Sequence, residues 1–260
     1  GIELSLNWHK EVIKDLNVDL RANFTYNRNK YVYYDEPNYE AVWKKKTGQP
    51  LSISWGYVSE GYFKNQEEID NGPDQSGLGS QVKPGDIKYR DVNGDGKIND
   101  DDKVMLSSFG SMPRIQYGLG LNLTYKKLDF GVFFNGSAQR KIMINSAMTE
   151  FGERNNNVMQ WIADDHWSID NPNPDAAFPR LGLSNTDIKN NKEASSHWLR
   201  NGNFIRFKTL EVGYSFPHCR VYFSGDNLAV WSPFKLWDPE LSWNAYPLQR
   251  TFNFGVQLNF

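Results

Sequence analysis

The clearest pattern in the chain is a strict alternation of apolar and polar residues over three long segments. In the last of them, every even position from 252 to 260 is apolar and every odd position from 251 to 259 is polar or glycine. Positions 16–26 and 115–125 alternate in the same way. Because successive side chains of a β-strand point to opposite faces of a sheet, this period of two predicts strands with one wholly apolar face. Strands of this length are unusual in soluble sheets.

Four weaker segments extend the same pattern. We predict further strands at 2–9, 128–138, 203–216 and 219–231, which brings the count to about seven. Arg206 and Lys208 interrupt the alternation within 203–216. We therefore expect either a β-bulge at these two residues or a position beyond the hydrocarbon layer of a membrane.

The predicted connections alternate strictly between short and long. Short connections follow the first, third and fifth strands, at 9–15, 126–127 and 217–218, and long ones lie at 28–114, 139–202 and 232–250. This alternation is typical of membrane barrels, in which tight turns face the periplasm and long loops face the outside. We predict an all-β fold, an antiparallel transmembrane β-barrel segment with these three long connections as extracellular loops. Because single-chain bacterial barrels close with an even number of strands, we expect residues 1–260 to be part of a larger barrel.

Composition supports this prediction and excludes other classes. Aromatic residues reach 15%, with 9 Trp, 13 Tyr and 16 Phe, a bias that favours β structure and membrane interfaces. The formal net charge of −2 provides no basic excess for nucleic acid. No segment approaches the ~18 consecutive apolar residues of a transmembrane helix, but a barrel strand needs only about 10 alternating ones. Cys219 is the single cysteine, so no internal disulfide can form.

No catalytic constellation is recognisable, and we predict that the chain is not an enzyme. The four histidines are scattered without metal-protease spacing, and the neighbours His218 and Cys219 fall in a predicted short turn. Gly118 and Gly120 lie inside a predicted strand and match no phosphate-binding loop. We expect these two glycines to permit close packing at the inner wall of the barrel.

One polar segment, from 91 to 102, has the spacing of an EF-hand calcium loop. Oxygen-bearing side chains occupy positions 1, 3, 5, 9 and 12, and Gly96 stands at position 6, where the loop needs a sharp turn. The loop ends in Asp where Glu is usual, which weakens bidentate ligation. The alternative, a polar Asx/Gly turn without a metal, stays open. The predicted Ca²⁺ ligands are Asp91, Asn93, Asp95, Lys97 (through its backbone carbonyl), Asn99 and Asp102.

Tryptophans are concentrated in the long connections. Rings in exposed loops can stack on sugars or anchor a protein partner, and they can equally form loop cores or an interfacial girdle. The candidates for partner or substrate contact are Trp55, Trp161, Trp167, Trp237 and Trp243.

Several motifs, taken together, resemble one known family. They are GDIKYRDVNGDG at 85–96, PRIQYG at 113–118, LDFGVFFNG at 128–136, FIRFKTLEVGYSFP at 204–217 and VYFSGDNL at 221–228, preceded by WGY at 55–57 and GYFKNQEEI at 61–69. Their identity and order resemble the C-terminal portion of SusC/RagA-family TonB-dependent transporters.

The resemblance carries further expectations. Members of the family are 22-stranded barrels with an N-terminal plug, and they import glycan or peptide fragments. A SusD-like surface lipoprotein closes the barrel mouth, and TonB supplies energy through the plug. The resemblance thus implies a wall segment without the plug, in the outer membrane of a Gram-negative, Bacteroidetes-like cell. The alternative is a soluble secreted calcium-binding β-protein, such as a carbohydrate-binding module.

Overall fold

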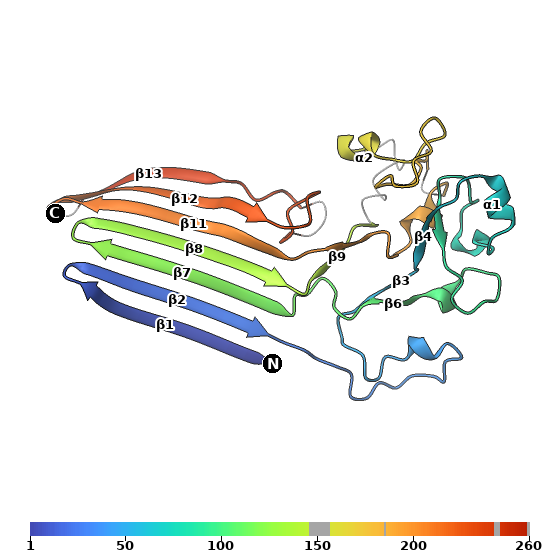
Figure 1. The fold of residues 1–260 in the computed structure, drawn as a ribbon, viewed down its shortest axis with the longest axis horizontal. Helices are drawn as coiled ribbons and strands as arrows, with labels where there is room; N and C mark the ends of the chain where they lie inside the picture. Colours follow the sequence, from blue (N-terminus) through green and yellow to red (C-terminus); the bar gives the residue numbers. More distant parts are fainter. Residues whose placement is uncertain (146–156, 185, 242–244, 259–260) are drawn as a thin grey trace. The chain divides into compact units, whose positions relative to one another are not determined.

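The structure, a computed structural model, describes residues 1–145, 157–184, 186–241 and 245–258. Its main element is a seven-stranded antiparallel sheet in which each strand lies beside its neighbours in sequence order, β1-β2-β7-β8-β11-β12-β13 (Figure 1). The strands are β1 (Ile2–Ile13), β2 (Leu16–Tyr26), β7 (Ile115–Tyr125), β8 (Leu128–Ala138), β11 (Phe204–Ser215), β12 (Cys219–Trp231) and β13 (Thr251–Leu258).

The predicted seven strands are confirmed, but the first strand is longer and its following turn shorter than expected. Strand β1 stays paired with β2 through the charged residues Lys10 and Glu11. The register shifts between Glu11 and Ile13, just before the turn. The connection predicted at 9–15 is therefore a two-residue turn, in which Asp15 has a φ of 66°. The predicted bulge is confirmed at Lys208, where the pairing of β11 shifts on both sides.

The register aligns the apolar positions of all seven strands on one face. One row across the sheet runs through Trp8, Leu20, Leu121, Val132, Leu210, Gly225 and Phe252. Polar residues and glycines dominate the neighbouring rows on the opposite face. A slip of one residue in any strand would transfer its apolar side chains to the polar face, so burial of one face fixes the register.

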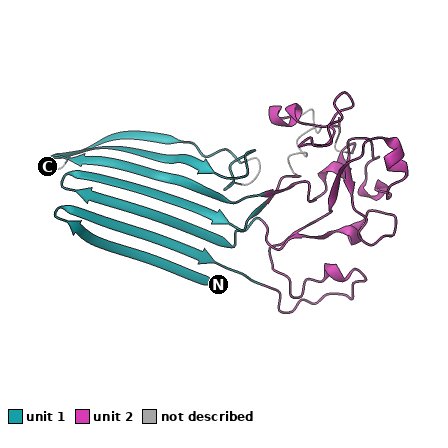
Figure 2. Cartoon of the chain, viewed as in Figure 1, with its two compact units in different colours: residues 1–29, 111–141, 201–260 teal, residues 30–110, 142–200 magenta. Residues whose placement is uncertain are grey.

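The short turns lie at one end of the sheet and the long connections leave from the other (Figure 1). Two of the long connections are not simple loops. Residues 30–110 and 142–200 form a compact unit of their own, hereafter the loop unit, whereas the sheet and the segment 232–250 belong to the other unit (Figure 2). The loop unit was not expected from the sequence, which predicted only loops at 28–114 and 139–202.

The loop unit contains short elements around an aromatic and aliphatic core. Its helices are α1 (Gln66–Asp70), α2 (Gln160–Asp164) and one-turn 3₁₀ helices at Val42–Lys44, Ser76–Leu78, Asp100–Asp102 and Lys189–Lys192. Its strands pair as β3 (Ser54–Gly56) with β6 (Val104–Ser107) and as β4 (Ser59–Tyr62) with β5 (Ile87–Tyr89). Where the chain passes between the units, β9 (Lys141–Met143) pairs with β10 (Leu199–Asn201). The buried core includes Tyr57, Phe63, Ile87, Tyr89, Ile98, Ile162, Phe178, Ile188 and Trp198.

Within the described ranges, neither α-helix has the length and apolar character that crossing a membrane would require.

Candidate functional site

The polar face of the sheet carries ion pairs between adjacent strands and, across β11, between β8 and β12. The Arg220 guanidinium of β12 lies between two carboxylates, 2.6 Å from Glu211 of β11 and 3.0 Å from Asp129 of β8. Near the other edge, His9 and Asp19 are directly opposite on β1 and β2, and their side chains approach to 2.7 Å. This face is also hollowed, with a concavity of about 670 Å³ lined mainly by its polar side chains. The polar face is therefore suited to contact with water and polar solutes.

The ring of Phe133 lies among the polar side chains of this face. Phe133 of β8 lies against Gly118 and Gly120 of β7, so that a Cβ built on either glycine would meet its ring at 3.2 or 3.4 Å. Both glycines are buried, while Phe133 is half-buried. The expectation that these glycines permit close packing at the wall is confirmed, and the ring that they accommodate was not anticipated.

Arg206 fastens the segment 232–250 to the sheet. Its side chain is 1% exposed, and its Nη2 lies 2.6 and 2.9 Å from the two carboxylate oxygens of Asp238. Its Nε donates to Glu240 at 3.0 Å, and its Nη1 donates to Asn227. A buried cation with this many oxygen partners is held in one geometry. The arginine that interrupts the alternation of β11 is thus a structural anchor.

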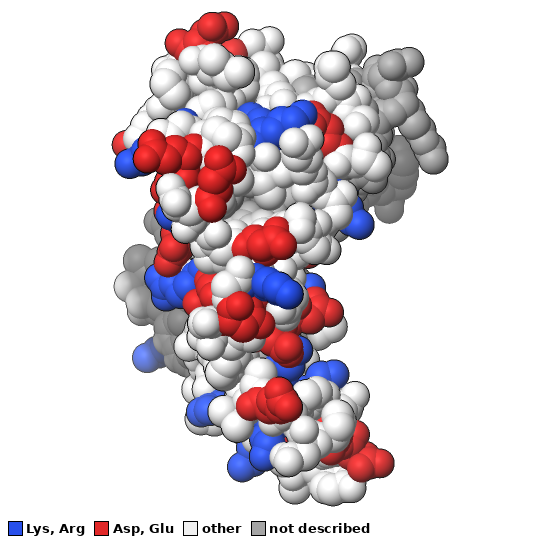
Figure 3. All heavy atoms as spheres, turned by 90° about the vertical axis from the view of Figure 1, so that its right-hand side faces the viewer, with Lys and Arg blue, Asp and Glu red and all other residues white. Residues whose placement is uncertain are grey.

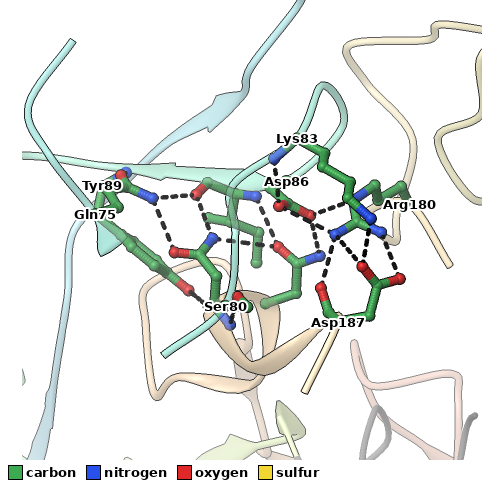
Figure 4. Close-up of polar contacts among 10 residues, drawn as sticks. Gln75, Ser80, Lys83, Asp86, Tyr89, Arg180 and Asp187 are labelled. Atoms are coloured by element: carbon green, nitrogen blue, oxygen red, sulfur yellow. Dashed lines mark hydrogen bonds and ion pairs between the residues drawn. The ribbon is translucent and has the colours of Figure 1, made fainter. Parts of the chain in front are cut away.

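A network of buried amides organises the loop unit (Figure 4). Asn190 and Asn191, both fully buried, bond the backbone of Ile87 through their side chains at 3.0 and 2.8 Å. Gln75 donates to Asn190 at 2.9 Å and accepts from the amide of Tyr89 at 2.7 Å. Because buried polar groups need partners, these bonds fix strand β5 against the segment 188–192.

The network continues into a buried ion pair. The Asp86 carboxylate, fully buried, lies 2.7 Å from Arg180 Nε and accepts a bond from Asn191 at 2.7 Å. Arg180 also contacts Asp187 at 3.1 Å, and Lys83 Nζ approaches the same carboxylate at 2.6 Å (Figure 4). Burial raises the pKa of Asp86, and the neighbouring Arg180 opposes that shift. The ion pair joins two segments that are 94 positions apart in the chain.

His197 is a second group in the loop unit with a perturbed pKa. Burial and the adjacent Arg200 cation lower the pKa of His197 to about 4. Its ring meets the indole of Trp198 edge-on, with centroids 4.5 Å apart, and its Nε2 lies 3.4 Å from the Tyr62 hydroxyl. The imidazole is therefore neutral near pH 7 and packs as part of the core.

The predicted calcium loop forms a tight polar turn. Asp91 accepts backbone bonds from Gly94 and Gly96 at 2.7 and 2.8 Å, and the two oxygens of Asp102 each accept one backbone bond at 2.8 Å. Asn93 Oδ1, Asp95 Oδ1 and Asn99 Oδ1 also accept backbone bonds. Lys97 bridges to Asp74 through the backbone. In the part of the chain that the structure describes, no three acidic, histidine or cysteine side chains converge as a metal site. Calcium binding by this loop stays a prediction.

The tryptophan candidates lie in different environments. Trp167 is 4% exposed and packs over Gly85, which makes this ring part of the core of the loop unit and not a surface contact. Trp55 is half-buried in β3, and Trp161 lies beside Phe178 with centroids 5.2 Å apart. Trp237, also half-buried, donates to the Ala245 carbonyl at 3.0 Å. Trp243 lies outside the described residues.

On the face drawn in Figure 3, acidic and basic side chains are interspersed.

The chain is similar in sequence and in fold to known outer-membrane proteins. No family model matches the chain. It is 31% identical to the TonB-dependent receptor P26 of Formosa agariphila over 82% of its length, and 27% identical to the TonB-dependent receptor SusC of Bacteroides thetaiotaomicron over its whole length. It also superposes on a structure of the RagAB peptide importer in a closed-closed state, with a TM-score of 0.66 at 23% identity over 99% of the chain. The chain belongs to the SusC/RagA family of TonB-dependent transporters.

Membership of this family identifies which face of the sheet contacts lipid and which lines the lumen. In a SusC/RagA barrel wall, the apolar face contacts lipid and the hollowed polar face lines the lumen, so we call them the lipid face and the lumen face. Strands β1 and β13 are the edges of this sheet, and edges in a membrane must pair with further strands. The chain spans 23% of P26, 26% of SusC and 29% of the RagAB chain. The relatives are named as receptors and transporters.

Proposed function

We propose that this chain forms part of the wall and the extracellular loops of an importer in the outer membrane of a Bacteroidetes-like, Gram-negative cell. The importer would take up oligosaccharides or peptides, driven by TonB through a plug outside this segment. It would work with a SusD-like surface lipoprotein and catalyse no covalent reaction. The observation that carries the proposal is the continuous separation of lipid and lumen faces across seven strands, in a chain that resembles such importers throughout.

The loop unit and the segment 232–250 support the partner part of this proposal. Loops that are large and internally bonded are usually functional, and a core with buried amides and ion pairs gives a surface of defined shape. Trp55, Trp161 and Trp237 are half-buried and are candidates for contact with the lipoprotein or the substrate. Asp91–Asp102 is the proposed calcium loop, and an ion there would order the surrounding backbone.

The test is uptake by cells that carry the full-length protein. Labelled neutral oligosaccharides and labelled tryptic peptides are supplied to cells with the intact gene, to cells without it, and to cells with the intact gene but no TonB. We expect one of the two substrate classes to accumulate only when both the gene and TonB are present. Equal accumulation of both classes in all three strains would contradict the proposed function.

A further inference from the structure

The short turns of the sheet form a basic rim at the end opposite to the long connections (Figure 1). The three turns lie at 14–15, 126–127 and 216–218. They contain three lysines and one carboxylate, namely Lys14, Lys126, Lys127 and Asp15. Because the whole chain has a formal net charge of −2, this is a local excess of positive charge. Short turns of a membrane barrel face the periplasm, so the rim lies at the headgroups of the periplasmic leaflet.

The turn between β7 and β8 is fixed at the centre of this rim by backbone bonds to both neighbouring turns. The Lys126 amide donates to the Asp15 carbonyl at 3.1 Å, and the Ser215 amide donates to the Lys127 carbonyl at 2.8 Å. Strands β2 and β11, which flank the β7–β8 hairpin, both belong to this chain. The lipid side of this turn is therefore bordered on both sides by the chain itself, and wall strands outside this segment cannot insert there.

Aromatic side chains underlie the turn on the lipid face. The Lys126 ammonium lies 5.2 Å from the centroid of the Tyr125 ring. Tyr125 pairs with Leu16 and Leu128, and Leu128 pairs in turn with Tyr214 of β11. Tyrosine rings favour the depth of the lipid headgroups, and a lysine stem can follow apolar surface while its ammonium stays among the headgroups. The contact with Tyr125 therefore holds the Lys126 charge on the lipid side of the rim.

Neither lysine of this turn is neutralised by the chain. Lys126 and Lys127 are exposed, and in the part of the chain that the structure describes neither ammonium forms an ion pair. The nearby carboxylates of Asp129 and Glu211 are both engaged by Arg220. Two adjacent cations without a carboxylate partner, at the depth of the headgroups, attract an anion.

We propose that Lys126 and Lys127 bind the phosphate of an anionic glycerophospholipid in the periplasmic leaflet. The acyl chains of this lipid would lie along the apolar row that contains Leu16, Tyr125 and Leu128. Charge complementarity selects an anionic lipid such as phosphatidylglycerol, because a zwitterionic lipid carries its own cation beside the phosphate. A lysine near an anionic membrane surface strengthens the attraction roughly fivefold. The inference goes beyond the import function and rests on the membrane location of the lipid face.

The test uses the full-length protein with Cys219→Ser, in which Leu123→Cys supplies the only cysteine and carries a bimane fluorophore. Leu123 lies on the lipid face one row away from Tyr125. The protein is reconstituted in an equimolar mixture of phosphatidylglycerol and phosphatidylcholine, with the acyl chains of one lipid or the other brominated. We expect brominated phosphatidylglycerol to quench the bimane more strongly, by an amount that corresponds to a preference of roughly tenfold. The preference should fall in about 0.5 M salt.

A pair of double variants separates the site from the overall charge. Lys126→Gln/Lys127→Gln should abolish the preference for phosphatidylglycerol. Arg28→Gln/Lys30→Gln removes two exposed cations that follow the opposite end of β2, and this matched control should keep the preference. Quenching by brominated phosphatidylcholine in each variant shows that the protein is inserted in the bilayer.

Three results would overturn the lipid site. They are equal quenching by the two brominated lipids in the wild type, a preference that survives Lys126→Gln/Lys127→Gln, and a preference that both double variants lose equally. Failure of the membrane assignment gives a different result: neither brominated lipid would quench the bimane, whereas aqueous iodide would.

Discussion

Arg206 and Asp238 form a two-pronged ion pair across 32 positions of the chain, with one guanidinium nitrogen 2.6 and 2.9 Å from the carboxylate oxygens. The side chains are only 1% and 9% exposed. Because a buried charge is costly without its partner, the pair fixes where the segment 232–250 meets the lumen face of β11.

Replacing Arg206 with Ala should release that segment. The substitution leaves the Asp238 carboxylate without its main partner, at a cost of about 3 kcal/mol. Limited chymotrypsin digestion of the full-length protein should then cut within 232–250 faster than in the wild type. Arg21→Ala removes an exposed arginine of the same face and is the control. Equal cleavage rates in the wild type and Arg206→Ala would show that other contacts hold the segment.

Removal of Arg180 should destabilise the loop unit specifically. Arg180→Ala would leave Asp86 buried without its cation, and we expect a loss of about 3 kcal/mol or more. Hydrogen exchange of peptides from 75–89 and 186–198 should accelerate, while exchange in the sheet stays unchanged. Arg90→Ala breaks the more exposed pair with Glu60 in the same unit and should cost less than about 1 kcal/mol. Unaltered exchange in Arg180→Ala would contradict the importance of the buried pair.

The loop unit should also lose stability in acid through His197. Its pKa is lowered from 6.5 to about 4, so the unfolded state binds the proton more readily. This contribution is complete above pH 6.5 and is lost as the pH falls from 6.5 toward 4, by about 3 kcal/mol. Hydrogen exchange of 186–200, corrected for intrinsic rates, should increase over that range in the wild type and much less in His197→Phe. His218→Gln should behave as the wild type, and identical pH profiles for all three would refute the assignment.

Calcium should protect the polar loop at 91–102 from hydrogen exchange. In the full-length protein, millimolar Ca²⁺ should slow hydrogen exchange across 91–102, and both Asp91→Asn and Asp95→Asn should weaken that effect. Asp100 lies in the same loop at a position that is not a predicted ligand, so Asp100→Asn is the matched control. No effect of Ca²⁺ on exchange in the wild type would leave a polar turn without a metal.

The sheet could be predicted from sequence because the residues that specify each strand and each short turn are close together along the chain. Period-two alternation identifies each strand, and the short turns at 126–127 and 216–218 force neighbouring strands to pair. The bulge at Lys208 was visible because Arg206 and Lys208 break the alternation. The length of β1 was underestimated because backbone pairing continues through charged residues that the pattern takes as a turn.

The loop unit could not be predicted because its core is assembled from distant segments without periodicity. Nothing local indicates that Asp86 pairs with Arg180, or that Trp167 packs on Gly85 inside the core. Phe133 was overlooked for a related reason. In the sequence it is one aromatic residue at a polar-face position, and its packing against the glycines of the adjacent strand becomes visible only when the two strands are aligned.

The central claim is that the two faces of this sheet contact lipid and water, and β13 tests it most directly. Phe254 and Gln257 should lie on opposite faces, and Phe254 is 84% exposed on the apolar side. In the full-length protein with Cys219→Ser, spin labels are placed at 254 or 257 and the protein is reconstituted in lipid. We predict that oxygen relaxes the label at 254 more strongly, and that a water-soluble nickel complex relaxes the label at 257 more strongly. Equal access of the nickel complex to both labels would contradict the account.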